Sequence, residues 1–92
     1  DLYVDEGMCH YWLKDYKEAI NCFKKIKSPN RDSLFYLAAS LEKAGRGKES
    51  SEALNLAVKT TDMSVENFVN TQRYQDPDYN RELLEVLDSI PR

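Results

Sequence analysis

The feature of this sequence that most constrains its fold is a pattern of large and small side chains that recurs after 31 residues, as from Tyr3 to Leu34. Helices that pack together approach closely at small residues and interlock at large ones. A repeat of this kind therefore predicts two similar packing units in succession. The overlaid pairs are Tyr3 with Leu34, Gly7 with Ala38, Glu18 with Glu49, Ala19 with Ser50, Phe23 with Leu54 and Ile26 with Ala57.

The apolar residues of both units follow helical spacing. In the first unit a stripe that includes Phe23 and Ile26 predicts a helix over 16–27, which Ser28, Pro29 and Asn30 bring to an end. In the second unit the same spacing predicts one helix through 34–41 and another over 48–60. The second stripe contains Leu34, Leu37, Ala38 and Leu41, and the last helix has Ala53, Leu54, Ala57 and Val58 as its buried edge.

Short connections join these helices. Gly45 and Gly47 supply the flexible backbone that a tight turn between two helices requires. Short turns between amphipathic helices force neighbours to lie antiparallel. Residues 1–61 are therefore predicted to form two successive helical hairpins in an all-α fold.

These residues resemble the tetratricopeptide repeat (TPR) family, whose unit follows the pattern W-x2-L-G-x2-Y, G-x-Y, A-x3-F and P. Glu6 and His10 depart from the pattern in the first unit, as do Gly47 and Ser50 in the second. The resemblance implies an α-α superhelix that acts in protein–protein interaction as a scaffold. The first unit matches at or near Tyr3, Gly7, Tyr16, Ala19, Phe23 and Pro29, and the second at Leu34, Leu37, Ala38, Leu41, Gly45, Leu54 and Ala57.

The last third of the chain, 62–92, is predicted to form two helices that cap the repeats. Ser64 can cap a short helix that continues to Asn70, and Asp76 followed by Pro77 can start a longer one. A polar outer side on the last helix suits an element that closes a helical array. Its expected inner face consists of Tyr79, Leu83, Val86, Leu87 and Ile90.

The order of motifs in this segment also resembles the end of the TPR region in some bacterial signalling proteins, including class III adenylate cyclases. The motifs are Ser-Val-x-x-Phe, Arg-Tyr-x-Asp-Pro and an acidic amphipathic helix. Because position 1 is Asp, we interpret the sequence as one TPR-like domain, residues 1–92, taken from a longer chain. The resemblance implies an alternative function, a regulatory or dimerising tail of a larger signalling enzyme or transcription regulator.

Composition excludes several classes of partner. A net charge of -3 provides no positive field for nucleic acid, and the longest apolar stretch, 34–39, is too short to insert into a membrane. Two cysteines, Cys9 and Cys22, fit neither a disulfide scaffold nor a zinc site, so we expect reduced thiols in a cytoplasmic protein. No metal or cofactor is expected.

The sequence gives no indication of an enzyme. His10 is the only histidine, and inside a helix it is expected to pack against the partner helix. Cys9 points about 100° away from it along the helix, so the two are poorly placed to pair. A basic cluster at the end of the second helix is expected to complement the helix dipole, and the alternative is contact with an acidic partner or phosphate. That cluster contains Lys24, Lys25, Lys27 and Arg31.

The first helices of the two hairpins carry the predicted binding residues. In the TPR family such helices line a concave groove, and the matching positions here are mostly aromatic and apolar, as in a groove that anchors a peptide or helix. Contact with another repeat or with a second copy of the chain explains the same residues equally well. The predicted partner-binding residues are Val4, Met8, Tyr11, Trp12, Phe35, Ala39, Glu42 and Lys43, within a wider set that adds Asp1, Asp5, Asp32 and Tyr36.

Overall fold

The computed structural model describes residues 2–72 and 75–91, and in these residues every regular element is an α-helix. The predicted all-α class is therefore confirmed. Asp1, named above among the groove positions, lies outside the described residues. The helices are α1 (Leu2–Trp12), α2 (Tyr16–Lys24), α3 (Arg31–Lys43), α4 (Gly47–Thr61), α5 (Val65–Asn70) and α6 (Pro77–Asp88).

Local sequence explains where three of the helices begin. Asn30 and Ser33 form a reciprocal capping box, in which each side chain accepts a hydrogen bond from the backbone N–H of the other. Ser64 caps α5 by accepting from the N–H of Asn67. Asp76 caps α6 with Pro77 at its first position, so the caps predicted for the last two helices are confirmed.

The second helix ends earlier than its apolar stripe predicts. It stops at Lys24 rather than at 27, and the next two N–H groups bond to carbonyls three residues back, Lys25 to Cys22 and Ile26 to Phe23. Ser28 precedes Pro29, and a residue before proline is disfavoured in helical geometry. The backbone therefore forms a tighter turn and leaves the helix, although Ile26 remains buried.

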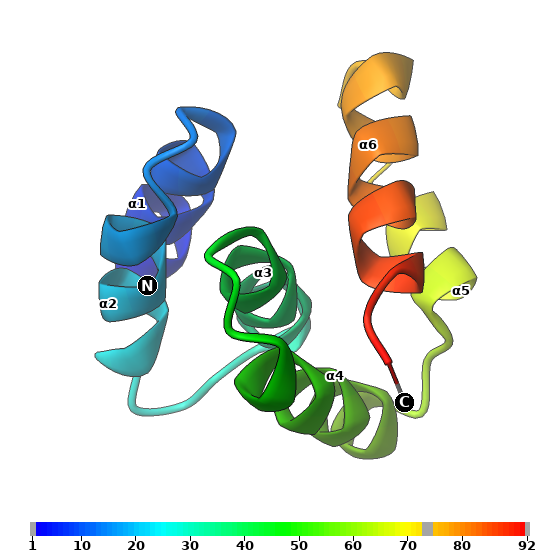
Figure 1. Cartoon of the computed structure of the whole chain (residues 1–92), viewed down its shortest axis with the longest axis horizontal. Coiled ribbons are helices and arrows are strands. Elements are labelled where there is room, and N and C mark those ends of the chain that lie inside the picture. Colours follow the sequence, from blue (N-terminus) through cyan, green and yellow to red (C-terminus); the bar gives the residue numbers. More distant parts are fainter. Residues whose placement is uncertain (1, 73–74, 92) are drawn as a thin grey trace.

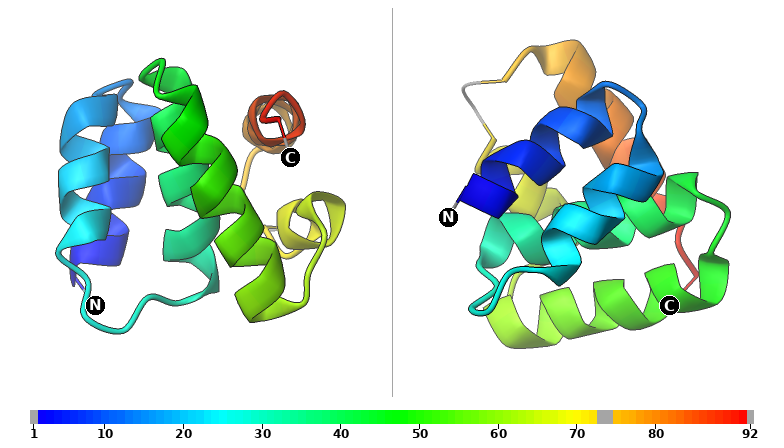
Figure 2. Two further views of the ribbon diagram at one scale, coloured as in Figure 1. Left: turned by 60° about the horizontal axis from the view of Figure 1, so that its bottom comes forward. Right: turned by 90° about the vertical axis from the view of Figure 1, so that its left-hand side faces the viewer.

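The helices form three pairs that lie side by side (Figure 1): α1 with α2, α3 with α4, and α5 with α6. The helix α3 is central, because it contacts α1, α2, α4 and α6. In the left view of Figure 2, α6 is seen nearly end-on while α1 to α4 are seen from the side. The last helix thus crosses the hairpins rather than continuing their stacking.

Some of the positions related by 31 residues are buried in both hairpins, although Tyr3 is 39% exposed and its counterpart Leu34 is buried. Phe23 and Leu54 are both buried, as are Ala19 and Ser50. At Gly7 a Cβ atom would lie 2.6 Å from the ring of Phe23, so this approach of α1 to α2 requires glycine. The sequence period therefore reflects a similar burial of side chains in the two hairpins.

Aromatic rings join the three pairs into one core. Phe35 of α3 stacks on Phe68 of α5, with ring centroids 4.2 Å apart. Tyr36 meets Tyr11 edge-on at 5.4 Å and Phe68 at 6.1 Å. Such pairs add about 0.5–1.5 kcal/mol each beyond the apolar area that they bury. The C-terminal helices are thereby integrated with the repeats.

Within 2–72 and 75–91, none of the helices has both the length and the apolar character that crossing a lipid bilayer demands.

Candidate functional site

Half of the predicted partner-binding residues lie inside the molecule. Val4, Tyr11, Phe35 and Ala39 are between 0% and 6% exposed. A side chain in this position has already exchanged water for protein neighbours and has no surface left for a partner. The expectation that these four form an open binding face is therefore corrected.

The C-terminal helices explain much of this burial. Phe68 of α5 covers the ring of Phe35, and α6, in which Leu83 and Leu87 are completely buried, packs against α3. From the sequence, the C-terminal third was predicted to cap the end of the helical repeats. In the structure it also covers the face of α3 on which an external peptide was expected.

The other four predicted residues remain partly or fully accessible, but two of them serve structural contacts. Glu42 accepts hydrogen bonds from Ser50 of α4 (2.9 Å) and from Ser89 after α6 (3.3 Å). The ammonium group of Lys43 lies 5.8 Å from the ring of Tyr16. Glu42 therefore contacts α4 and the residue that follows α6, and of the eight predicted residues only Met8 and Trp12 line a hollow surface.

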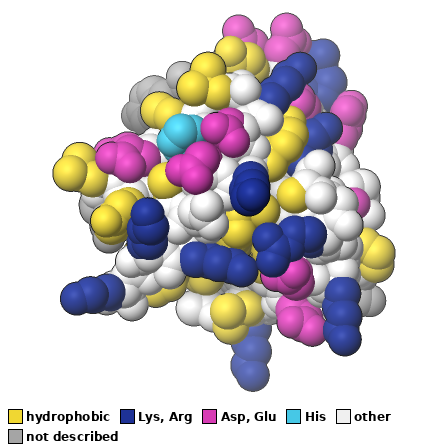
Figure 3. Space-filling view, turned by 60° about the vertical axis from the view of Figure 1, so that its left-hand side comes forward, with side chains coloured by type: hydrophobic (Ala, Val, Ile, Leu, Met, Phe, Trp, Pro, Cys, Tyr) yellow, Lys and Arg dark blue, Asp and Glu magenta, His cyan; other side chains and the backbone are white. Residues whose placement is uncertain are grey.

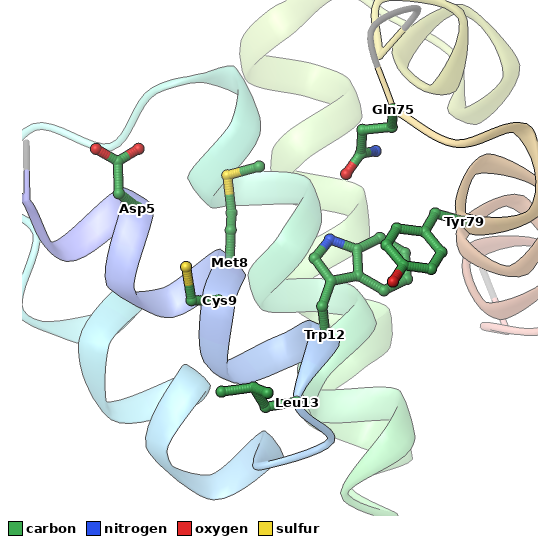
Figure 4. A pocket seen from close by; sticks show the side chains of 7 residues that line it. All are labelled: Asp5, Met8, Cys9, Trp12, Leu13, Gln75 and Tyr79. Atoms are coloured by element: carbon green, nitrogen blue, oxygen red, sulfur yellow. The ribbon is translucent and has the colours of Figure 1, made fainter.

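That hollow is a groove of about 510 Å³ between α1 and the beginning of α6. Figure 4 shows Trp12 and Tyr79 stacked at one end and Asp5 at the other. The two rings are 4.6 Å apart and nearly parallel, with an angle of 15° between their planes. Most of the lining is apolar, as is usual for sites that bind a ligand or a peptide side chain. The lining residues are Asp5, Met8, Cys9, Trp12, Leu13, Gln75 and Tyr79.

A chain of hydrogen bonds holds the α6 side of this groove in place. Tyr36 donates to Gln75 Oε1 (3.2 Å), and Gln75 Nε2 donates to Asn80 Oδ1 (3.0 Å). Asn80 in turn donates to the carbonyl of Gln72 (2.9 Å), whose own side chain donates to Asp32 (3.2 Å). Because both ends of the chain lie on α3, the start of α6 is fixed relative to the repeats. The groove is therefore preformed.

The groove borders a region in which phenol groups resist ionisation. Burial raises the pKa of Tyr36 to about 12, and the hydrogen bond with Gln75 opposes this shift. Burial also raises the pKa of Tyr11, and the neighbouring Tyr16 and Glu82 act in the same direction. Both hydroxyls are thus neutral at physiological pH. Among the lining residues that the structure describes, Asp5 is the one acidic or basic side chain of the types Asp, Glu, Lys and Arg.

The residues considered for catalysis do not converge. His10 is partly exposed rather than packed in the core, and its Nδ1 lies 3.7 Å from a carboxylate oxygen of Asp15. Cys9 is exposed and Cys22 is buried, and both are free thiols. Burial raises the pKa of Cys22, which disfavours the reactive thiolate. Over residues 2–72 and 75–91 there is no group of three or more side chains of the types that bind metal ions.

The basic cluster lies on the outer surface and is partly neutralised. In Figure 3 Lys and Arg side chains gather over the lower half of the visible face, below the single histidine and its acidic neighbours. Lys24 lies 3.8 Å from Glu49, and Arg31 lies 3.4 Å from Asp32. Exposed pairs of this kind contribute little to stability.

Four lining residues were not among the predicted binding residues: Cys9, Leu13, Gln75 and Tyr79. Cys9 was considered only as a thiol beside His10, Leu13 follows α1 and is 76% exposed, and Gln75 is the unspecified position of the Arg-Tyr-x-Asp-Pro motif. Tyr79 was assigned to the inner face of α6, yet it is 48% exposed because it lies at the edge of that helix against Trp12. For Leu13, its apolar character at a helix end was the sequence signal that could have revealed its place in the groove.

Comparison of the chain with family models, with curated proteins and with solved structures gave no match.

Proposed function

We propose that this protein is a non-catalytic interaction module, a TPR-like pair of helical hairpins that binds a peptide or helix from another protein. The observation that carries the proposal is the preformed groove in which Met8, Trp12, Leu13 and Tyr79 are presented together. Aromatic residues and methionine are the side chains that most often anchor a bound peptide. The docking surface is this groove rather than the broader face expected from the repeats.

Exposure of the groove residues supports the same proposal. Leu13, which follows α1, keeps 76% of its surface in water, and Leu2 at the start of α1, outside the groove, keeps an equal share. Covering apolar surface is worth about 25 cal/mol per Å². A partner that fills the groove would therefore gain free energy without any rearrangement of the core.

The experiment is a selection of binding peptides from a random library, followed by measurement of their affinity for two variants. Leu13→Asp places a charge in the groove, and Leu56→Asp places the same charge on α4, where Leu56 is 55% exposed. We expect Leu13→Asp to weaken binding by about tenfold or more and Leu56→Asp to leave it unchanged. Equal affinity of the selected peptides for both variants would reject the groove as the docking surface.

A second candidate is a dimerising segment of a larger signalling protein, in which a second copy covers the exposed leucines Leu2 of α1 and Leu13 just after it. Sedimentation equilibrium of the isolated chain distinguishes the interaction module from the dimerising segment. A dimer that Leu13→Asp converts to a monomer would support this second function, whereas a monomeric wild-type chain would favour the interaction module.

A further inference from the structure

The internal repeat indicates what kind of element fits the groove. Positions 31 residues apart relate Asp5 to Tyr36 and Cys9 to Ser40. Both residues of α3 are completely buried. The end of the groove near Asp5 and Cys9 is thus the counterpart of a face that is covered in the second hairpin, whereas Trp12 and Leu13 correspond to the exposed Lys43 and Ala44.

Helices of the first hairpin contribute to that cover. The ring of Tyr36 lies 5.4 Å from Tyr11 and 6.1 Å from Trp12, both of α1, and 6.4 Å from Phe23 of α2. These rings lie at helical positions and present their edges or faces to α3. By the same packing, the element that suits the open face of α1 is a helix with large apolar side chains.

The two faces differ in charge at one of these positions. The position of Tyr36 is taken on α1 by Asp5, which has no hydrogen-bond or ion-pair partner in the described part of the chain. A helix that docks here would remove water from the carboxylate. That cost is offset only if the docking helix brings a cation to it.

The distance between the two ends of the groove sets the spacing on the partner. Asp5 and Trp12 lie seven residues apart on α1, which corresponds to roughly 10 Å along the helix axis. A helix lying along α1 would therefore place its basic residue about two turns from the apolar side chain that meets Trp12 and Tyr79.

We propose that the groove binds an amphipathic helix of a partner protein that carries Lys or Arg two turns from an apolar anchor, with the cation paired to Asp5. This inference rests on the proposed function, and it adds the charge and the spacing of the partner. The apolar anchor fills the aromatic end of the groove. Pairing with Asp5 makes the groove prefer a helix that carries the cation over other apolar helices.

The test uses three synthetic helical peptides of about four turns, alike in a central group of leucines on one face. Each peptide carries one type of residue both two turns before and two turns after the leucines: lysine in the first peptide, glutamine in the second and glutamate in the third. Because the residue is present on both sides, the result does not depend on the direction in which the peptide binds. Trp12 is the only tryptophan of the chain and lines the groove, so its fluorescence reports binding. We expect the lysine peptide to bind about 3- to 10-fold more tightly than the glutamate peptide, and less so at high salt.

The matched variant is Asp5→Lys, which reverses the charge at an exposed position and should invert the order of the lysine and glutamate peptides. Lys17→Glu, a charge reversal on the exposed side of α2, is the control that should leave the order unchanged.

Equal binding of the three peptides, unaltered by Asp5→Lys but lost in Leu13→Asp, would overturn the inference and leave the proposed function standing. Absence of binding by every peptide would reject both. Self-association of the wild-type chain through Leu13 would also overturn the inference, because the occupant would then be a second copy.

Discussion

The helices α1 and α3 open the two hairpins with related sequences, yet only α1 keeps an accessible face. On α3, Tyr36, Ala39 and Ser40 are completely buried, and the ring of Tyr36 contacts both Tyr11 of the first hairpin and Phe68 of α5. On α1, the equivalent positions are Asp5, Met8 and Cys9, which line the groove. The difference teaches that a repeat defines which residues can form an interface, while the neighbouring elements determine whether the interface is internal or open.

The largest expected effect tests the covered side of this comparison. Phe35→Ala removes a completely buried ring that stacks on Phe68, and we expect it to lower the free energy of unfolding by about 3–5 kcal/mol through cavity formation. Leu13→Ala on the open side should cost less than about 0.5 kcal/mol. Urea denaturation followed by circular dichroism measures both. Similar losses for the two variants would contradict the contrast between a covered α3 and an open α1.

The second effect tests the close approach within the first hairpin. Gly7→Ala introduces a methyl group 2.6 Å from the buried ring of Phe23, so we expect a loss of about 1–3 kcal/mol in the free energy of unfolding. Gly47→Ala is the control, because a Cβ atom there meets nothing within 4 Å. A thermal midpoint that falls in both variants alike would show that the packing against Phe23 is not the cause.

A smaller effect concerns the aromatic end of the groove. Tyr79→Ala removes the ring that stacks on Trp12, and we expect a loss of about 1 kcal/mol because Tyr79 is 48% exposed. The emission of Trp12 should shift to longer wavelength as water reaches the indole. Tyr79→Phe keeps the stacked ring and should preserve both stability and emission. An unchanged emission in Tyr79→Ala would place Trp12 away from α6.

The smallest effect distinguishes the second helices of the two hairpins. Glu18 and Glu49 are equivalent by the repeat, but only Glu49 has Arg46 three residues before it. Hydrogen bonds from Arg46 lower the pKa of Glu49 below its ordinary value.

A lowered pKa in the folded state gives stability that is present above the unfolded pKa of about 4.3 and is lost as the pH falls through the folded value. We expect Arg46→Gln to return the pKa of Glu49 toward its ordinary value, measured by NMR titration of the carboxyl carbon. The change in stability should be slight, since the pair is exposed to solvent. A titration of Glu49 that is the same in both proteins would show that Arg46 does not pair with it in solution.

The sequence predicted most of the local structure because the relevant interactions join residues close in the chain. Helical spacing, the cap at Ser64 and the pair Asp76 and Pro77 all act within one or two turns. The end of α2 was predicted too late in the chain because apolar spacing continues beyond the helix. Ile26 keeps its place in the apolar stripe after the helix has ended.

The candidate site was only partly predictable. Met8 and Trp12 were identified from the repeat, and both line the groove. Gln75 and Tyr79 reach it because a chain of hydrogen bonds to α3 positions the start of α6. No pattern within a single segment specifies where two segments more than sixty residues apart will meet.

Spacing along each helix is a property of the sequence alone, so the sequence specifies that the chain is helical and which side chains could be buried. Which of those side chains stay accessible depends on how the helices pack together. A side chain is buried when an element from elsewhere in the chain packs on it. Here α5 and α6 pack on α3, and the face of α1 beside Tyr79 stays open.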